Sequence, residues 1–198
     1  GLHIPFAELL KEPTWIWIGG VCGLIFLTGN ILLFSKLGGV QTVVLPVLGQ
    51  ILMGLIIDDF GLFYSQKTPL SVFRIVGAVL VIVGVVLVSM AKEAKTGNTK
   101  QQKSEGVSLW LWRVFGVCAG MLSATQTAVN GYLGKVVGSP IKASVISFSV
   151  GTIFLVITCI VLHLKNNKSE QKKDKTKKNP WWMWIGGILG GLYILANV

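Results

Sequence analysis

The sequence predicts an all-α integral membrane protein with six transmembrane helices. Composition is the first indication: 52% of the 198 residues are hydrophobic, 13% are charged, and the mean hydropathy is +0.68. Soluble domains carry about a quarter charged residues. The apolar residues also fall into six long blocks, each near the ~20 residues that a helix needs to cross a bilayer. Finally, one block occurs twice, and the two copies constrain the arrangement of the whole chain.

The repeated block is Pro13–Asn30, which returns as Pro180–Asn197. The copies share a proline, two tryptophans, three glycines and the final asparagine at matching positions. The first copy is the first predicted crossing, and the second copy is the sixth, five crossings later. Successive crossings alternate in direction, so an odd offset reverses it. We therefore expect the two copies to run through the membrane in opposite senses. Inverted repeats of this kind are typical of secondary transporters, whose substrate lies near the bilayer midplane.

Three of the predicted helices precede the first charged linker. They are Pro13–Ser35, Val40–Ile57 and Ser71–Met90. Pro13 suits a first helical turn, where its missing N–H costs nothing. Trp15 and Trp17 would then lie at headgroup depth, where indole is favoured. Lys36–Gly39 is expected to be a tight turn, and Asp58–Gly61 is expected to end the second helix.

The other three predicted helices follow the linker Ala91–Ser108. They are Leu109–Gly134, Pro140–Leu164 and Pro180–Asn197. Ser139 is the expected N-cap of the middle one, and Pro140 is its expected first residue. A second lysine-rich linker, Lys165–Asn179, precedes the last helix.

The net charge of +10 arises mainly in these two linkers. This distribution favours anchoring at a membrane surface over binding to nucleic acid. One side of the membrane would carry the linkers and the turn at 36–39; the other would carry loops 1–12, 58–70 and 133–139. Because most lysines and arginines lie on the linker side, the positive-inside rule predicts that the linkers are cytoplasmic.

Amide side chains within the predicted helices are the candidate substrate-binding residues. An amide in hydrocarbon without partners costs a few kcal/mol, so these side chains should face the interior of the bundle. There they would either join helices together or line a polar path, and the sequence leaves both readings open. The candidates are Gln126, Asn130, Gln50, Asn30 and Asn197.

Gln50 has a further distinction, because it lies one turn after Pro46. A proline leaves the carbonyl four residues earlier, here that of Thr42, without its usual donor. A neighbouring helix, water or ligand must satisfy that carbonyl. A proline beside a buried amide therefore points to a binding site.

Asp58 and Asp59 are two adjacent acidic residues that directly follow a predicted span. Carboxylates are disfavoured at the C-terminal end of a helix, so they need a partner. An ion pair with Arg74 and a role in proton coupling are the two interpretations. The tryptophans at the span ends fit an interfacial belt better than a cation-binding cage. No metal-ligand spacing, phosphate loop or catalytic triad is visible, so an enzyme, a metal site and a cofactor are not expected.

Three motifs carry a resemblance to a known family. They read Gln126-Thr-Ala-Val-Asn130-Gly-Tyr-Leu-Gly134, Pro180-Trp-Trp-Met-Trp-Ile-Gly-Gly and Asp58-Asp-Phe-Gly61. The chain resembles the YdcZ-type inner-membrane exporters of the drug/metabolite transporter superfamily, whose unit has five transmembrane helices. The resemblance implies that residues 1–90 are helices three to five of one repeat, and that 109–198 are helices one to three of the next. The charged linker 91–108 would join them, so the chain looks like the middle of a ten-helix protein.

The resemblance also implies a function: export of a small molecule across the inner membrane by alternating access. The expected partners are the lipid bilayer, an unknown substrate, and the missing helices of the same chain or a second copy; nucleic acid is not expected. The alternative is a non-transporting scaffold or assembly subunit. A polar cavity near Gln126, Asn130 and Gln50 would favour transport, whereas amides paired within a dry bundle would favour the scaffold.

Overall fold

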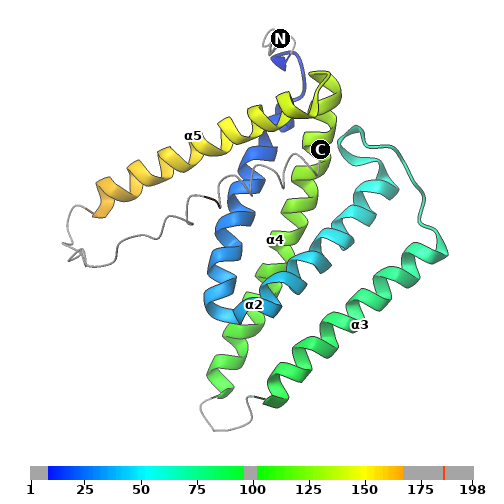
Figure 1. The fold of residues 1–198 in the computed structure, drawn as a ribbon, viewed down its shortest axis with the longest axis vertical. Coiled ribbons are helices and arrows are strands. Elements are labelled where there is room, and N and C mark those ends of the chain that lie inside the picture. The colour runs from blue at the N-terminus through cyan, green and yellow to red at the C-terminus, as the bar shows by residue number, and fades with distance from the viewer. Residues whose placement is uncertain (1–8, 96–101, 167–184, 186–198) are drawn as a thin grey trace.

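The computed structural model describes residues 9–95, 102–166 and 185 (Figure 1). Along the chain they form η1 (Thr14–Trp17), α2 (Ile18–Phe60), η2 (Leu62–Tyr64), α3 (Val72–Lys95), α4 (Gln102–Val136) and α5 (Pro140–Asn166). The described residues contain no strand, which confirms the predicted all-α class. The predicted helix Pro180–Asn197 lies outside the described residues apart from Ile185, so the second copy of the repeat cannot be compared with the first.

Helix α2 contains two of the predicted helices, joined at Gly38. Gly38 has φ 75° and ψ 172°, a conformation that only glycine adopts readily, and it is the one non-helical residue within α2. The chain reverses there, so that residues 18–37 form a first arm and residues 39–60 a second (Figure 1). The predicted turn at 36–39 is therefore correct in place but only one residue long. Each arm has about 20 residues, which matches the ~30 Å hydrocarbon core at 1.5 Å per residue.

The ends of the helices follow the local chemistry of the sequence. Gly61 ends α2 in the left-handed conformation (φ 64°), and its N–H donates to the carbonyl of Ile57. Helix α5 begins at Pro140 as predicted, and the carbonyl of Ser139 accepts a hydrogen bond from the Ala143 N–H at 3.2 Å. Helices α3 and α4 both extend into the range expected to be a charged linker, which leaves residues 96–101 between them.

Helix α4 packs along both arms of α2, and this pairing forms most of the described interior (Figure 1). Apolar side chains gather in two separate clusters. One cluster contains Leu9, Ile16, Leu133, Val137, Ala143 and Ile146, and the other contains Leu33, Leu37, Leu45 and Val85. On α4, the stretch between the two clusters carries the buried polar residues Ser123, Gln126 and Asn130. On α4, these buried polar side chains therefore lie between the parts of the helix that contact the two apolar clusters.

Loops that are distant in sequence meet at one end of the molecule. The ring of Trp15 lies 5.9 Å from that of Tyr64 and 5.1 Å from that of Tyr132, measured between centroids. The Tyr132 hydroxyl donates to Glu12 Oε2 at 2.7 Å. Residues near 12, 64 and 132 thus lie together, and the reversal between the two arms of α2 lies toward the opposite end (Figure 1). This agrees with the loop grouping inferred from the alternating crossings.

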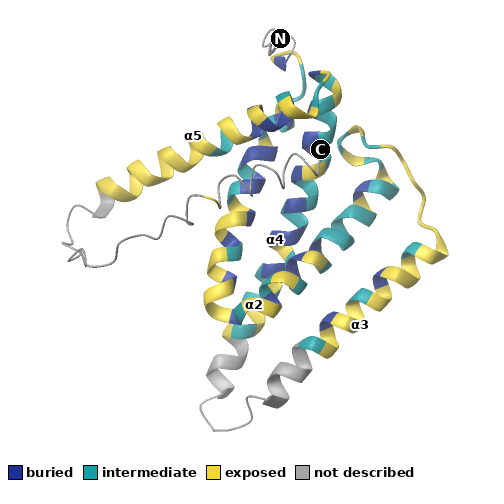
Figure 2. Ribbon diagram, in the orientation of Figure 1, coloured by how far each residue is buried: buried dark blue, intermediate teal, exposed yellow. Residues whose placement is uncertain are grey.

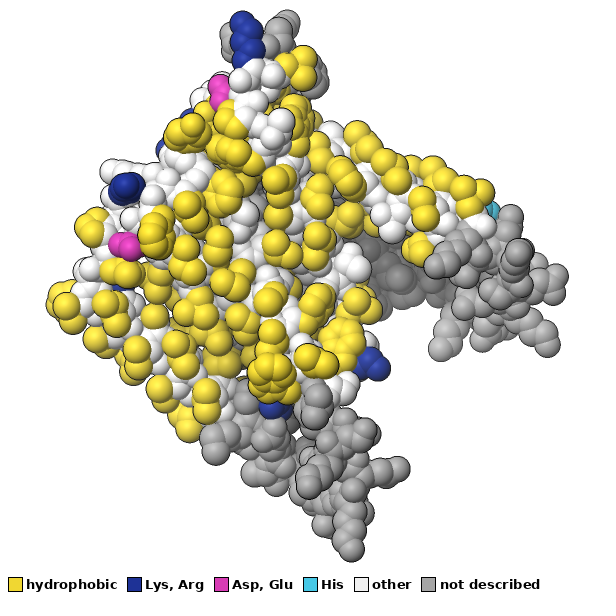
Figure 3. Space-filling model, turned by 180° about the vertical axis from the view of Figure 1, so that it is seen from behind, with side chains coloured by type: hydrophobic (Ala, Val, Ile, Leu, Met, Phe, Trp, Pro, Cys, Tyr) yellow, Lys and Arg dark blue, Asp and Glu magenta, His cyan; other side chains and the backbone are white. Residues whose placement is uncertain are grey.

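Much of the surface is apolar. Helix α3 and most of α5 are exposed along their length (Figure 2), and hydrophobic side chains cover most of the face seen in Figure 3, with charged ones toward its margins. By length and composition, the described residues contain two helices that could cross a membrane, Thr14–Phe60 and Pro140–Leu164. The apolar helix Val72–Val88 is shorter. Exposed apolar area on this scale is unusual for a soluble monomer.

Candidate functional site

The first arm of α2 lies against the polar stretch of α4, and two glycines make room for two amides. A Cβ atom on Gly23 would lie 2.6 Å from Gln126 Nε2, and one on Gly19 would lie 2.6 Å from Asn130 Oδ1. Both amide residues are buried, with 8% of Gln126 and 1% of Asn130 exposed. The four-residue spacing of the glycines thus matches that of the amides on the antiparallel helix.

The amide of Asn130 is held by α5. Its Oδ1 accepts a hydrogen bond from the hydroxyl of Ser147, which is also buried. A buried polar side chain with such a partner is satisfied within the protein. Through this bond Asn130 joins α4 to α5.

Three of the other predicted binding residues share a cavity of about 530 Å³ between the two arms of α2 and α4. We call it the central cavity. Its lining consists of Gly23, Phe26, Leu27, Asn30, Thr42, Val43, Pro46, Val47, Gln50, Gln126 and Phe148. It is thus an apolar space with a small number of amide and hydroxyl groups. That is the usual character of a small-molecule site.

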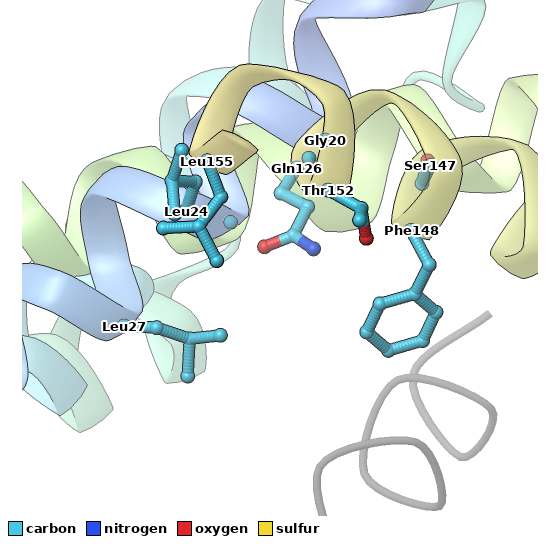
Figure 4. Close-up of a pocket in the computed structure, with 10 residues that line it drawn as sticks. Gly20, Leu24, Leu27, Gln126, Ser147, Phe148, Thr152 and Leu155 are labelled. Carbon is cyan, nitrogen blue, oxygen red and sulfur yellow. The ribbon is translucent and has the colours of Figure 1, made fainter. Parts of the chain in front are cut away.

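A smaller cavity of about 180 Å³ adjoins the central one and shares Gly23, Leu27, Gln126 and Phe148 with it. Figure 4 shows the Gln126 amide projecting into the space framed by Leu27, Thr152 and Phe148. Gln126 therefore faces both cavities, and α5 supplies the wall opposite α2.

A third cavity, of about 320 Å³, reaches from Gln50 to Asp58 and Ser65 at the end of α2, and we call it the end cavity. Gln50 is the residue that it shares with the central cavity. The Gln50 Nε2 donates to the hydroxyl of Ser123 on α4 at 3.1 Å. This one bond between two helices therefore lies where the two cavities adjoin.

Two residues that line the central cavity, Asn30 and Thr42, each carry an acceptor without its ordinary donor. Asn30 Oδ1 has no hydrogen-bond partner among the described residues, and it is fully buried, so it lies behind the cavity surface. Pro46 has no N–H, so the carbonyl of Thr42 loses its ordinary helical donor. The Thr42 hydroxyl does not compensate, because it donates to the carbonyl of Gly38 at 2.9 Å.

The carboxylates at the end of α2 are both bound. Arg74 Nη1 lies 3.0 Å from Asp58 Oδ2, and both side chains are more than a third exposed. Asp59 Oδ1 accepts a hydrogen bond from the N–H of Leu70 at 3.3 Å. The predicted ion pair between Asp58 and Arg74 is therefore confirmed. An exposed pair of this kind contributes less than about 1 kcal/mol to stability.

Trp15 belongs to an aromatic cluster at the same end, with Phe63, Tyr64 and Tyr132. Its ring centroid is 5.3 Å from that of Phe63, and the two tyrosine rings are 5.1 Å apart and stacked. These rings pack against one another at the end of the molecule where the loops meet. The arrangement fits the expected interfacial position of Trp15. The tryptophans at 181, 182 and 184 lie outside the described residues.

The structure therefore brings Asn30, Gln50 and Gln126 to one cavity and places Asn130 in a helix contact; Asn197 lies outside the described residues. Sequence patterns predicted no specific role for Ser123 or Ser147, the hydroxyl partners of two of these amides. Ser123 lies one helical turn before Gln126 and Thr127, and this spacing was the available signal. Nothing in the sequence pointed to the pairing of Ser147 with Asn130.

Comparisons with known proteins identify the family. Residues 2–87 and 111–198 match the family described as "Putative inner membrane exporter, YdcZ", of the drug/metabolite transporter type. The match covers most of the chain and omits the first charged linker, residues 91–108. No curated protein and no solved structure matched the chain. The chain therefore belongs to the YdcZ family of inner-membrane exporters, and it is a multi-pass protein of the inner membrane.

Proposed function

We propose that this chain forms the substrate path of a small-molecule exporter that works by alternating access. The observation that carries the proposal is the central cavity, in which Asn30, Gln50 and Gln126 meet between the arms of α2 and α4. Transporter families of this type are generally not enzymes, and this site would bind a small molecule and release it on the other side of the membrane. Membrane lipid would cover the exposed apolar faces of α3 and α5.

The proposed architecture has six spans belonging to two inverted five-helix repeats, with residues 1–90 in the first and 109–198 in the second. The two arms of α2, then α3, α4 and α5 alternate in direction along the chain, which supports this arrangement (Figure 1). A sixth span would then cross opposite to the first arm. Missing helices of the same protein or a second copy would complete the bundle, and the lysine-rich linkers would face the cytoplasm.

Alternating access requires a barrier that opens and closes, and the bond between Gln50 and Ser123 is suitably placed. When it is formed, it separates the central cavity from the end cavity; when broken, it would let the two join into a path toward Asp58. A cysteine at Thr42, in protein without native cysteines, should react faster with a water-soluble maleimide after Ser123→Ala. An unchanged rate would show that this bond is no barrier.

The scaffold alternative accounts for Asn130, whose amide is paired with Ser147. It does not account for the cavity of about 530 Å³ that Asn30, Gln50 and Gln126 line together, because a dry bundle would pair such amides with one another. This observation favours transport.

Gln126→Leu in the complete protein tests the proposal. Cells that express the wild-type protein are grown against a panel of toxic amines, metabolites and dyes, and any resistance is compared with that of the variant. We expect Gln126→Leu to abolish resistance at unchanged membrane abundance. Ser149→Ala, on the exposed side of α5, is the matched control and should retain it. Normal resistance with Gln126→Leu would reject the central cavity as the path, and loss of the protein from the membrane would favour the scaffold.

A further inference from the structure

A fourth cavity lies between the second arm of α2 and α3, and we call it the α3 groove. Its volume is about 400 Å³, and Met121 of α4 also contributes to its wall. It shares no lining residue with the other three cavities. Nine of its ten described wall residues are apolar, and the tenth is Asp59. The α3 groove is therefore an apolar site with one carboxylate, and the transport proposal makes no use of it.

The surroundings of the α3 groove favour a hydrocarbon chain as its contents. Phe60, Ile75 and Val79 on its wall are 49–66% exposed, and α3 is exposed along most of its length (Figure 2). In a protein of the inner membrane, such a surface meets the acyl chains of lipids. An acyl chain in the groove gains dispersion contacts with the wall, whereas water gains little from an apolar wall.

The carboxylate of Asp59 can be reached from outside the protein and has acceptor capacity left. Its Oδ1 accepts an exposed hydrogen bond of 3.3 Å from the Leu70 N–H, and no described residue donates to its Oδ2. The neighbouring Asp58 is instead paired with Arg74. Among the described wall residues, no other side chain is charged or carries a hydroxyl or amide group that could bind Asp59 in place of a ligand.

A carboxylate beside an apolar groove fits a lipid whose head group is a primary ammonium ion. Such an ion brings opposite charge together with N–H donors, and charge-assisted hydrogen bonds are the strong ones. A trimethylammonium group has the same charge but no donor, and an anionic head group is repelled. The phosphate next to the ammonium ion is also matched, because Arg74 directly precedes the wall residue Ile75 and is itself partly exposed.

We infer that the α3 groove binds a phospholipid with a primary ammonium head group, of which phosphatidylethanolamine is the simplest. One acyl chain lies between α3 and the second arm of α2, and the ammonium ion donates to Asp59. A protein helix is a poorer occupant, because it would bury this carboxylate, and a buried charge needs a partner. The inference does not depend on the proposed function, because the groove is separate from the central cavity.

Four lipids with the same two oleoyl chains test the inference: phosphatidylethanolamine, its N,N-dimethyl derivative, phosphatidylcholine and phosphatidylglycerol. The complete protein is purified in detergent and depleted of lipid, and native mass spectrometry gives the dissociation constant of the first bound lipid. We expect phosphatidylethanolamine to bind at least fivefold more tightly than phosphatidylcholine, with the dimethyl derivative between them. Equal binding of these three, tighter binding of phosphatidylglycerol, or no binding of phosphatidylethanolamine would overturn the inference.

Variants of Asp59 assign the preference to its carboxylate. Asp59→Asn should reduce the preference for phosphatidylethanolamine over phosphatidylcholine to less than about twofold. Glu12→Gln makes the same change of charge at the same end of the molecule and should leave the preference intact. Asp59→Lys should make phosphatidylglycerol the tightest of the four lipids. That gain cannot arise from misfolding, so it decides the test if Asp59→Asn is unstable. Retention of the wild-type order in Asp59→Lys would show that Asp59 does not meet the head group.

Two neighbouring positions on α3 test the place of the acyl chain. Ala78 lies on the wall and is 9% exposed, so Ala78→Leu fills part of the groove. It should weaken the binding of all four lipids at least threefold and keep their order. Gly77→Leu adds a larger side chain where nothing lies within 4 Å of the new Cβ, and it should bind as the wild type does. Wild-type binding by Ala78→Leu would show that the acyl chain lies elsewhere, and the inference would fail.

Discussion

Two glycine pairs with the same four-residue spacing have different surroundings in this molecule. On α4, Gly120 meets backbone: a Cβ there would lie 2.0 Å from the carbonyl oxygen of Pro46. Its partner Gly116 faces Leu45 at 3.1 Å. On the first arm of α2, the glycines at 19 and 23 instead face the ends of two amide side chains. One pair brings helix backbones together, and the other leaves room for polar groups.

Four-residue spacing alone therefore does not reveal what a pair of glycines does. Small residues at four-residue intervals let helices approach closely, and that is the usual reason for the motif in membranes. At Gly120 that reason suffices, because the second arm of α2 crosses α4 in backbone contact. At Gly23 the space is occupied by the amide of Gln126, which then reaches the cavities. The role of each glycine therefore depends on the residue that it faces on the neighbouring helix.

Gly120→Ala should cause the largest loss of stability. The added methyl group would overlap the backbone of Pro46, which cannot move away as a flexible side chain could. We expect the free energy of unfolding to fall by about 3 kcal/mol, at the upper end for an overpacked interior. Thermal unfolding in detergent and abundance in the membrane measure the effect. A variant with wild-type stability would show that the two helices do not touch at this point.

Gly23→Ala should instead impair transport and cost little stability. The new methyl group meets the end of the Gln126 side chain, which can rotate away at a cost of about 1 kcal/mol. The amide then leaves its position between the two cavities, so resistance should be largely lost at near-normal abundance. Adding Gln126→Ala relieves the clash, and the double variant should regain stability without regaining resistance. If Gly23→Ala unfolds the protein as Gly120→Ala does, the two pairs do not differ as described.

Ser147→Ala should have a moderate effect, confined to stability. It removes the hydroxyl that donates to Asn130 Oδ1 and leaves a buried acceptor without a partner. We expect a loss of about 1–2 kcal/mol. Resistance per folded molecule should be retained, because Ser147 acts here through a helix contact. A selective loss of resistance would place Asn130 on the substrate path instead.

Gly77→Ala on α3 should have the smallest effect. Nothing lies within 4 Å of the position that the new methyl group would occupy. Alanine is also a better helix former than glycine by up to about 1 kcal/mol. Unfolding temperature and abundance should therefore be unchanged or slightly raised. Destabilisation comparable to that of Gly120→Ala would mean that a neighbour covers this face of α3.

The sequence predicted what depends on local chemistry. The apolar blocks located the helices, Gly61 and Pro140 marked two helix boundaries, and the pair of Asp58 with Arg74 followed from charges on either side of one short loop. The linker boundaries were less accurate, because lysine and glutamine are compatible with helix as well as with loop. Polar composition was therefore a poor guide to where α3 ends and α4 begins.

The candidate site could be predicted only in part, because it depends on how helices cross. The cost of burying an amide selected Asn30, Gln50 and Gln126, and the structure places all three on the central cavity. Their role in binding stays a prediction. The same cost also selected Asn130, yet its partner Ser147 comes from α5, and no periodicity within one helix indicates which neighbour it meets. Some buried amides are hydrogen-bonded within the protein and others face a cavity. Only the packing of the helices determines which is which.

The reversal at Gly38 also has a consequence for how the protein enters the membrane. One residue separates the two arms of α2, so bringing them together closes almost no loop and costs little chain entropy. Contacts of such short sequence separation form quickly. The two arms can therefore leave the translocation machinery as a preformed hairpin, with Leu33, Leu37 and Leu45 already in contact near the turn. Helix α4, which arrives later in synthesis, then docks on a surface that is already built.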